Sequence, residues 1–300
     1  MGLASGQRAT GGRCGSPVRV EGATLMPKVL VAFLSVLVSA GALSAQGIGN
    51  LAIAGNQVSA TVDLPGFSAD LTLTFEQAVG LTGSNLGLSA QLVDPHDPNL
   101  LSRLPAGGLV TLPGAFPVLL RVQPPASGGL SFGGIYTLDL HTHNLQFTAN
   151  CPLRLFSAPD GGPFDDITVN MGTGSYRVRG TKGSFSDFVI VADVRLLAGV
   201  VSQKFDGLSG LLSTYAGVIS APVLDDLTHQ LQTARTFYQA GDNVDAAKTV
   251  DGFAATVQRN SGTGIPDVWR ASGDLPDVAG RLRAAAGTLS FSLGLAPAAP

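Results

Sequence analysis

Residues 57–76 read QVSATVDLPGFSADLTLTFE, two runs of alternating apolar and polar residues on either side of the turn Pro65-Gly66. The apolar residues recur at every second position and include Val58, Ala60, Val62, Leu71, Leu73 and Phe75. Successive side chains of a strand point to opposite faces of its sheet, so a period of two predicts strands with one buried face. This stretch therefore predicts β-structure that covers an apolar core.

The same period continues from about residue 48 to about residue 195. Further strands are expected at residues 86–92, 118–122, 134–147, 153–157, 167–171, 175–180 and 185–194. Turns rich in Gly, Pro and Asp separate them, and residues 99–116 indicate a long loop with a helical turn. About eight to ten short strands with no helix between them predict an antiparallel β-sandwich over residues 46–200.

After about residue 203 the apolar period becomes helical. Four apolar stripes follow one another: Leu208, Leu211, Leu212, Tyr215 and Ile219; Leu224, Leu227, Leu231 and Ala234; Ala247, Val250 and Val257; and Val278, Leu282 and Leu289. Gly241 is placed to end the second helix, and Asp242 or Asn243 to begin the third. Amphipathic helices joined by short loops predict an antiparallel helical bundle over residues 201–292.

The expected fold class is therefore segregated α+β, with an N-terminal antiparallel β-sandwich followed by a C-terminal antiparallel helical bundle. The final residues 293–300, LGLAPAAP, are rich in Ala and Pro and are predicted to form a disordered tail.

Residues 26–45, MPKVLVAFLSVLVSAGALSA, have the pattern of a secretory signal peptide. Lys28 supplies the positive start, an apolar run follows, and small residues precede the expected cleavage near Gln46. The run is shorter than the roughly 20 residues that a membrane crossing needs. We expect a secreted or periplasmic protein with no membrane insertion after cleavage.

Residues 1–25 have no periodicity and carry three arginines. They are either an extended start of the signal peptide or, as we favour, the result of a wrongly chosen upstream start codon, with Met26 the true start; if the segment is made, we expect it to be disordered.

From Gln46 onward the chain has 14 basic and 20 acidic residues, a formal net charge of −6. A nucleic-acid-binding surface needs clustered Lys and Arg, so no nucleic-acid partner is expected. The partner expected is an extracellular or surface ligand of unknown identity. Cys151 is the only cysteine after the signal peptide and is interpreted as a small buried apolar residue.

The sharpest candidate for chemistry is the string DLHTH, in which Asp139, His141 and His143 share one face of a predicted strand, about 7 Å apart. Two imidazoles and a carboxylate are suitable ligands for zinc or a similar metal. The string also resembles the opening motif of metal-dependent phosphoesterases of the polymerase-and-histidinol-phosphatase type. That resemblance ends after five residues, because the further His and Asp ligands of that family are missing. The favoured interpretation is a solvent-facing strand with no metal.

Other candidates have structural explanations. Asp94, His96, Asp97 and Asn99 fall in one loop, and Asp165-Asp166 follow a Gly-Gly-Pro turn. Neither group has the spacing of a defined calcium loop, and turn formation accounts for both.

Two further features involve Arg and Trp. Arg177 and Arg179 share a strand face that is expected to be solvated rather than an anion site. Trp269, the single tryptophan, is expected to fill the core of the helical bundle.

Three long segments resemble a family of secreted proteins of Gram-negative bacteria known as a domain of unknown function. They are residues 141–180, HTHNLQFTANCPLRLFSAPDGGPFDDITVNMGTGSYRVRG; residues 183–193, GSFSDFVIVAD; and residues 264–289, GIPDVWRASGDLPDVAGRLRAAAGTL. The resemblance implies export and a bacterial source, but no activity.

The C-terminal part also resembles small helical modules of bacterial extracellular proteins, which implies attachment or spacing. That resemblance rests on the spacing of Val223 to Leu231, on Ala240-Gly241-Asp242, on residues 246–257 and on Gly264-Ile265.

Three functions are compatible with these features. The favoured one is an exported non-enzymatic protein with a binding, attachment or structural role, because nucleophile elbows, phosphate loops and zinc-protease motifs are all missing from the sequence. No catalytic residue, cofactor or metal is therefore assigned. The alternative is a metal-dependent or carboxylate hydrolase of an extracellular glycan or ester that uses the Asp139/His141/His143 face. A subunit of a surface assembly is the third possibility.

Overall fold

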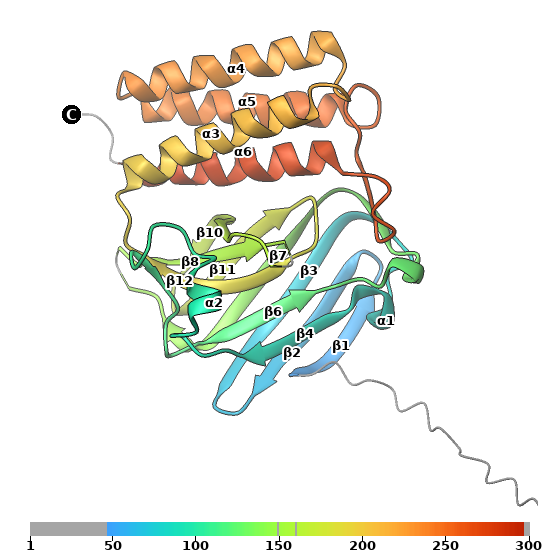
Figure 1. Ribbon diagram of the computed structural model, residues 1–300, viewed down its shortest axis with the longest axis vertical. Helices are drawn as coiled ribbons and strands as arrows, with labels where there is room; N and C mark the ends of the chain where they lie inside the picture. Colours follow the sequence, from blue (N-terminus) through green and yellow to red (C-terminus); the bar gives the residue numbers. More distant parts are fainter. Residues whose placement is uncertain (1–46, 149, 160, 297–300) are drawn as a thin grey trace, which may run out of the picture. The chain divides into compact units, whose positions relative to one another are not determined.

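Two antiparallel sheets and four long C-terminal helices are the main elements of the computed structural model (Figure 1). It describes residues 47–148, 150–159 and 161–296, which cluster in one compact unit. The predicted signal peptide at residues 26–45 and the segment 1–25 lie outside the described residues. The predicted class, a two-sheet antiparallel region followed by helices, is confirmed.

The first sheet contains the stretch 57–76 as its strands β2 and β3. Its order is β1 (Ile48–Ala54), β2 (Gln57–Leu64), β3 (Phe67–Val79), β7 (Ser131–Gln146), β11 (Ser175–Lys182) and β10 (Thr168–Gly172), and β13 (Val268–Arg270) also pairs with β7. Every described pairing is antiparallel. The long strands β3 and β7 are central, so their side chains have fixed neighbours on both sides.

The second sheet has the order β4 (Leu88–Leu92), β6 (Val118–Val122), β12 (Asp187–Asp193), β8 (Leu153–Ala158) and β9 (Asp165–Asp166), with β5 (Val110–Thr111) beside β12. Three short helices, α1 (Gly83–Leu86), α2 (Pro98–Leu101) and η1 (Ala126–Gly128), lie in its connections. The helix α2 lies in the loop where a helical turn was expected.

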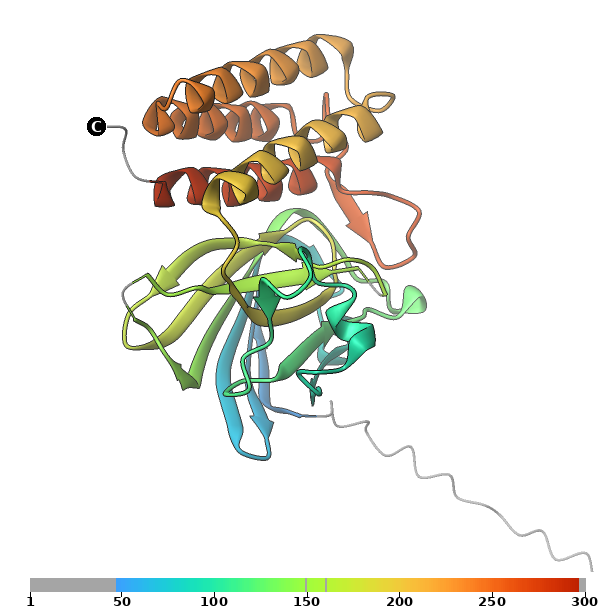
Figure 2. The same ribbon diagram turned by 60° about the vertical axis from the view of Figure 1, so that its left-hand side comes forward.

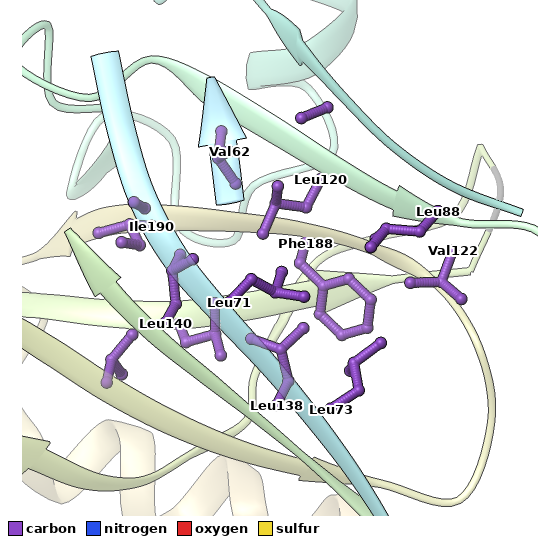
Figure 3. Close-up of a cluster of buried hydrophobic side chains, with 14 of the residues drawn as sticks. Val62, Leu71, Leu73, Leu88, Leu120, Val122, Leu138, Leu140, Phe188 and Ile190 are labelled. Carbon is purple, nitrogen blue, oxygen red and sulfur yellow. The ribbon is translucent and has the colours of Figure 1, made fainter. Parts of the chain in front are cut away.

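The main core lies between the two sheets. Figure 3 shows side chains from both sheets meeting there, among them Leu71 and Leu138 of the first sheet and Leu120 and Phe188 of the second. These positions come from the alternating runs, so the predicted period of two is confirmed as the pattern of this core. Cys151 is buried in this core, as predicted.

A smaller core covers the other face of the second sheet. There Phe156 and Val189 pack against Leu100 and Leu104 from the connection that contains α2, and against Phe164. The middle strands of this sheet are therefore buried on both faces.

The helical part consists of α3 (Leu197–Tyr215), α4 (Ala221–Gln239), α5 (Asn243–Asn260) and α6 (Val278–Leu295), which share one apolar core. Asp242 caps α5 by accepting a hydrogen bond from the Asp245 N–H, and Gly241 has a φ of 84° after the end of α4. Both predicted helix boundaries are thus confirmed. The helix α6 continues into the predicted tail, where Leu293 is buried.

Within the described part of the chain, none of the helices has the length and hydropathy that a membrane crossing would require.

The helices α3 and α6 lie nearest to the sheets (Figures 1 and 2). The first turn of α6 packs directly on the backbone near the end of β11, since a Cβ on Gly183 would lie 2.5 Å from the backbone nitrogen of Arg281. Two ion pairs also join the layers, Arg283 to Glu76 at 2.7 Å and Lys204 to Asp166 at 2.7 Å. These contacts fix the space between α3, α6 and the sheets.

Candidate functional site

The DLHTH string lies in the central strand β7, and Asp139, His141 and His143 share the outer face of the first sheet, as predicted. Asp139, however, accepts a hydrogen bond from Arg179 Nε at 2.7 Å. Its carboxylate is thus engaged with the neighbouring strand β11 rather than with the histidines.

A different carboxylate joins the two histidines. Asp70 of β3 is the direct cross-strand neighbour of His141. Its Oδ2 atom lies 3.3 Å from His141 Nδ1 and 3.1 Å from His143 Nε2. The hypothesis of an Asp139/His141/His143 set is therefore corrected to Asp70, His141 and His143, whose potential ligand atoms all lie within 4.8 Å of one another.

The other acidic candidates are structural. The Asp94 carboxylate accepts a hydrogen bond from the His96 N–H, and the Asp97 carboxylate caps α2 through the Asn99 N–H. Turn formation therefore explains this loop, as predicted. Among the described residues, the group with Asp70 is the one that brings three possible metal ligands together.

A cavity of about 670 Å³ lies between the helices α3 and α6 and the sheets. We call it the interlayer cavity. Its lining includes Asp165 and Asp166 of β9, Lys182 at the end of β11, Lys204 of α3 and Arg281 of α6. The elements that meet here are far apart in the sequence, and the sequence pattern gave no indication of the cavity.

Most charges around the interlayer cavity are neutralised by partners. Lys204 Nζ is 2.7 Å from Asp166 Oδ2, and both side chains are buried. Arg195 pairs with Asp193 at 2.7 Å. These pairs hold α3 and the chain leading into it against the second sheet.

Lys182 and Arg281 differ from those residues. Neither side chain forms a hydrogen bond or ion pair with any other described residue, and Arg281 Nε is buried without a partner. They lie close enough for the charge of Arg281 to act on Lys182. Two cations therefore line one cavity and, among the described residues, contact no carboxylate, although the charge of Asp165 acts on Lys182.

Burial controls the ionisation of this pair. Desolvation, opposed by the charge of Asp165 and assisted by that of Arg281, lowers the pKa of Lys182 to about 8. Burial raises the pKa of the Asp165 carboxyl, although the nearby Lys182 and Arg195 act in the opposite direction. At neutral pH Lys182 therefore still carries its charge.

One wall of the interlayer cavity is aromatic. Trp269 of β13 stacks on Phe132 with ring centroids 5.3 Å apart and meets Phe185 edge-on at 4.7 Å. Trp269 thus packs against the core between the sheets and lines the cavity, so its predicted place in the bundle core was wrong. The misprediction arose because Trp269 lies in a short strand within the helical part of the sequence.

The fold and these sites define a class of two-sheet protein that carries four C-terminal helices over a charged cavity. The chain belongs to the family of unknown function DUF6689, whose model matches residues 33–296. The predicted membership of a domain of unknown function is thereby confirmed. None of the curated proteins compared with the chain matches it.

Proposed function

We propose that this chain is an exported, non-enzymatic binding protein that holds a small organic anion in the interlayer cavity. The observation that carries the proposal is the pair Lys182 and Arg281, two cations that line the cavity and form no ion pair with a carboxylate of the described residues.

The physical argument concerns desolvation. Removing a charge from water is costly unless a partner or hydrogen bonds compensate for it. Desolvation lowers the pKa of Lys182 to about 8 although the charge of Asp165 opposes the shift, and Arg281 repels the ammonium. A bound carboxylate would accept hydrogen bonds from both side chains and would remove this repulsion.

The rest of the cavity favours an organic anion over a bare inorganic one. Small-molecule sites are mostly apolar with a few polar groups that orient the ligand, and their volumes are on the order of 300–1,000 Å³. The interlayer cavity falls in that range at about 670 Å³ and includes Trp269, Phe185 and Leu211. These side chains would contact an apolar ligand body while the cations hold its acidic group.

Export is supported by the signal-peptide pattern at residues 26–45. A ligand-binding role outside the cytoplasm, secreted or periplasmic, is also compatible with the scarcity of catalytic motifs in the sequence.

Calorimetric titration of the purified protein with benzoate tests the proposal, with the uncharged benzamide as the matched probe. Emission of Trp269 is a second readout, since the chain has a single tryptophan and it lines the cavity. A charge-assisted hydrogen bond is worth about 1.5–3 kcal/mol, so Lys182→Met and Arg281→Met should each weaken benzoate binding roughly 10- to 100-fold.

Lys248→Met is the control, because Lys248 is an exposed lysine of α5 that pairs with Asp245. It should leave benzoate affinity unchanged. Equal affinity for benzoate and benzamide, or full binding by the Lys182 and Arg281 variants, would refute an anion site in the interlayer cavity.

The alternative function, a metal-dependent hydrolase of a glycan or ester, has one specific observation in its favour, the group Asp70, His141 and His143. These residues lie on the outer face of the first sheet and are not part of the lining of the interlayer cavity. The binding role is preferred here because its residues line a cavity large enough for a small molecule.

A further inference from the structure

We propose that Asp70, His141 and His143 bind one zinc-type divalent ion on the outer face of the first sheet, independently of the interlayer cavity. The three side chains come from two adjacent central strands, β3 and β7.

The distances match the geometry of such an ion. Ligand atoms that each lie about 2.0–2.1 Å from a tetrahedral zinc ion are about 3.3 Å from one another. Asp70 Oδ2 lies 3.3 Å from His141 Nδ1 and 3.1 Å from His143 Nε2. Two of the three separations therefore match a tetrahedral ion, and the third, between the two histidine ligand atoms, is within 4.8 Å.

A neighbouring hydroxyl orients one of the imidazoles. Ser68 Oγ lies 3.0 Å from His143 Nδ1. If Nδ1 carries the proton and donates it to Ser68 Oγ, the lone pair of Nε2 faces Asp70. Metal-binding histidines are commonly held in this way by an acceptor for their other ring nitrogen.

The strands hold the ligands rigidly. Asp70 and His141 are paired in register, and their neighbours Leu71 and Leu140 are buried in the core beneath them. Thr142, between the two histidines, is buried and donates a hydrogen bond to the Tyr176 carbonyl at 3.0 Å. Sites on strands keep their geometry better than sites on loops.

The ligand set and its exposure identify the type of ion. Two imidazoles and one carboxylate suit zinc and similar transition metals better than calcium or magnesium. The side chains of His141, His143 and Asp70 are 28%, 44% and 56% exposed, so a fourth position would be open to water. Arg177, the other cross-strand neighbour of His141, would place a positive charge near the ion and limit its affinity.

The test is calorimetric titration of untagged protein with Zn²⁺ alone. We expect one ion per chain, and at least tenfold weaker binding in Asp70→Asn, His141→Gln and His143→Gln. Asp139→Asn and His96→Ala are the matched controls and should bind normally, because Asp139 pairs with Arg179 and His96 lies in an exposed loop. Thermal unfolding of each metal-free variant reports whether it is folded.

A second readout is the visible absorption of bound Co²⁺, which should show nitrogen and oxygen ligation in the wild type and in Lys182→Met. Loss of that spectrum in the three ligand variants would support the site. Failure of the wild type to bind Zn²⁺, or binding that survives loss of both His141 and His143, would overturn it. Lys182 lies outside this site, so Lys182→Met should keep the Co²⁺ spectrum while it weakens benzoate binding. The metal proposal and the anion proposal can therefore fail independently.

Discussion

Arg283 of α6 and Glu76 of β3 form a bidentate ion pair, with Nη1 to Oε2 and Nη2 to Oε1 both at 2.7 Å. Glu76 is the only glutamate of the described residues, and the pair joins the helical part to a central strand of the first sheet. Burial alone raises the pKa of Glu76, but the hydrogen bond and charge of Arg283, together with the Ile135 N–H, outweigh burial and hold this pKa below its ordinary value.

Glu76→Gln should therefore destabilise the fold in a pH-dependent way. A carboxyl whose pKa is lowered by folding stabilises the native state above its unfolded pKa, and this contribution is lost as pH falls through the folded pKa. The side chain is 40% exposed, so solvent screening limits the loss to roughly 1 kcal/mol. Urea unfolding should show a difference from the wild type at pH 7 that disappears in strong acid; an equal difference at both pH values would contradict this account.

Gly134→Ala should disturb the same ion pair by steric overlap with Glu76. Gly134 has a φ of 71°, and a Cβ there would overlap Glu76 Oε2. Gly129 has a φ of 72° but nothing within 4 Å of its Cβ position, so Gly129→Ala measures the backbone strain alone. We expect Gly134→Ala to cost about 1–3 kcal/mol of unfolding free energy, and more than Gly129→Ala. Equal costs would mean that Glu76 moves aside freely.

The stability of the wild type should fall as pH rises because of Asp277, and Asp277→Asn should remove this fall. Asp277 is the buried N-cap of α6, and burial, assisted by the charge of Asp267, raises its pKa to about 7. Between about pH 4 and pH 7 the native state therefore binds more protons than the unfolded state, and stability falls as pH rises across this range.

Asn caps a helix as well as Asp but carries no charge. The variant should match the wild type near pH 4 and exceed it at pH 8 by at most about 4 kcal/mol, at 1.36 kcal/mol for each pKa unit. Chemical unfolding across this range checks the prediction, which would be wrong if both proteins had the same pH profile.

Lys182→Met should stabilise the unliganded protein while it weakens anion binding. Folding lowers the pKa of Lys182 from 10.5 to about 8, mainly through burial. Below pH 8 the partly buried, desolvated ammonium opposes folding, and this penalty is relieved as pH rises from 8 to 10.5. The variant should gain up to about 3 kcal/mol at pH 7, and the gain should shrink above pH 8.

The deprotonation of Lys182 should also determine how benzoate affinity depends on pH. Benzoate affinity of the wild type should fall as pH rises through about 8, since Lys182 then loses its charge. Affinity that stays constant from pH 7 to pH 10 would exclude Lys182 from the binding site.

Arg177→Gln should tighten Zn²⁺ binding at the Asp70 group. Arg177 is the cross-strand neighbour of His141, and two unit charges 4 Å apart in water interact by about 1 kcal/mol. We expect Zn²⁺ affinity to rise roughly two- to fivefold, and this rise should be smaller at high salt. Weaker Zn²⁺ binding in this variant would indicate that Arg177 helps to build the site.

The sequence was sufficient to predict the sheets and the helices, because burial on one face produces a period of two or of 3.6 residues. Four strands were not predicted individually, and two of them, β5 and β9, have only two residues each. The edge strand β1 has mostly exposed or half-buried residues, and β13 has only three residues. Short or edge strands bury too little to produce a pattern.

The candidate sites were harder to predict because they depend on contacts between distant segments. His141 and His143 were recognised from their spacing, but their third partner is set by the register of β3 against β7, which places Asp70 opposite His141. Asp139 shares their strand face and yet bonds to Arg179. The interlayer cavity requires the docking of α6 beside the end of β11, and no local pattern encodes that contact.

The most direct test of the anion-binding account is a crystal structure of the protein soaked with benzoate. The account predicts the carboxylate between Lys182 Nζ and the Arg281 guanidinium, with the ring near Trp269. A structure in which benzoate binds elsewhere, or in which Lys182 pairs with Asp165 and the interlayer cavity holds only water, would contradict it.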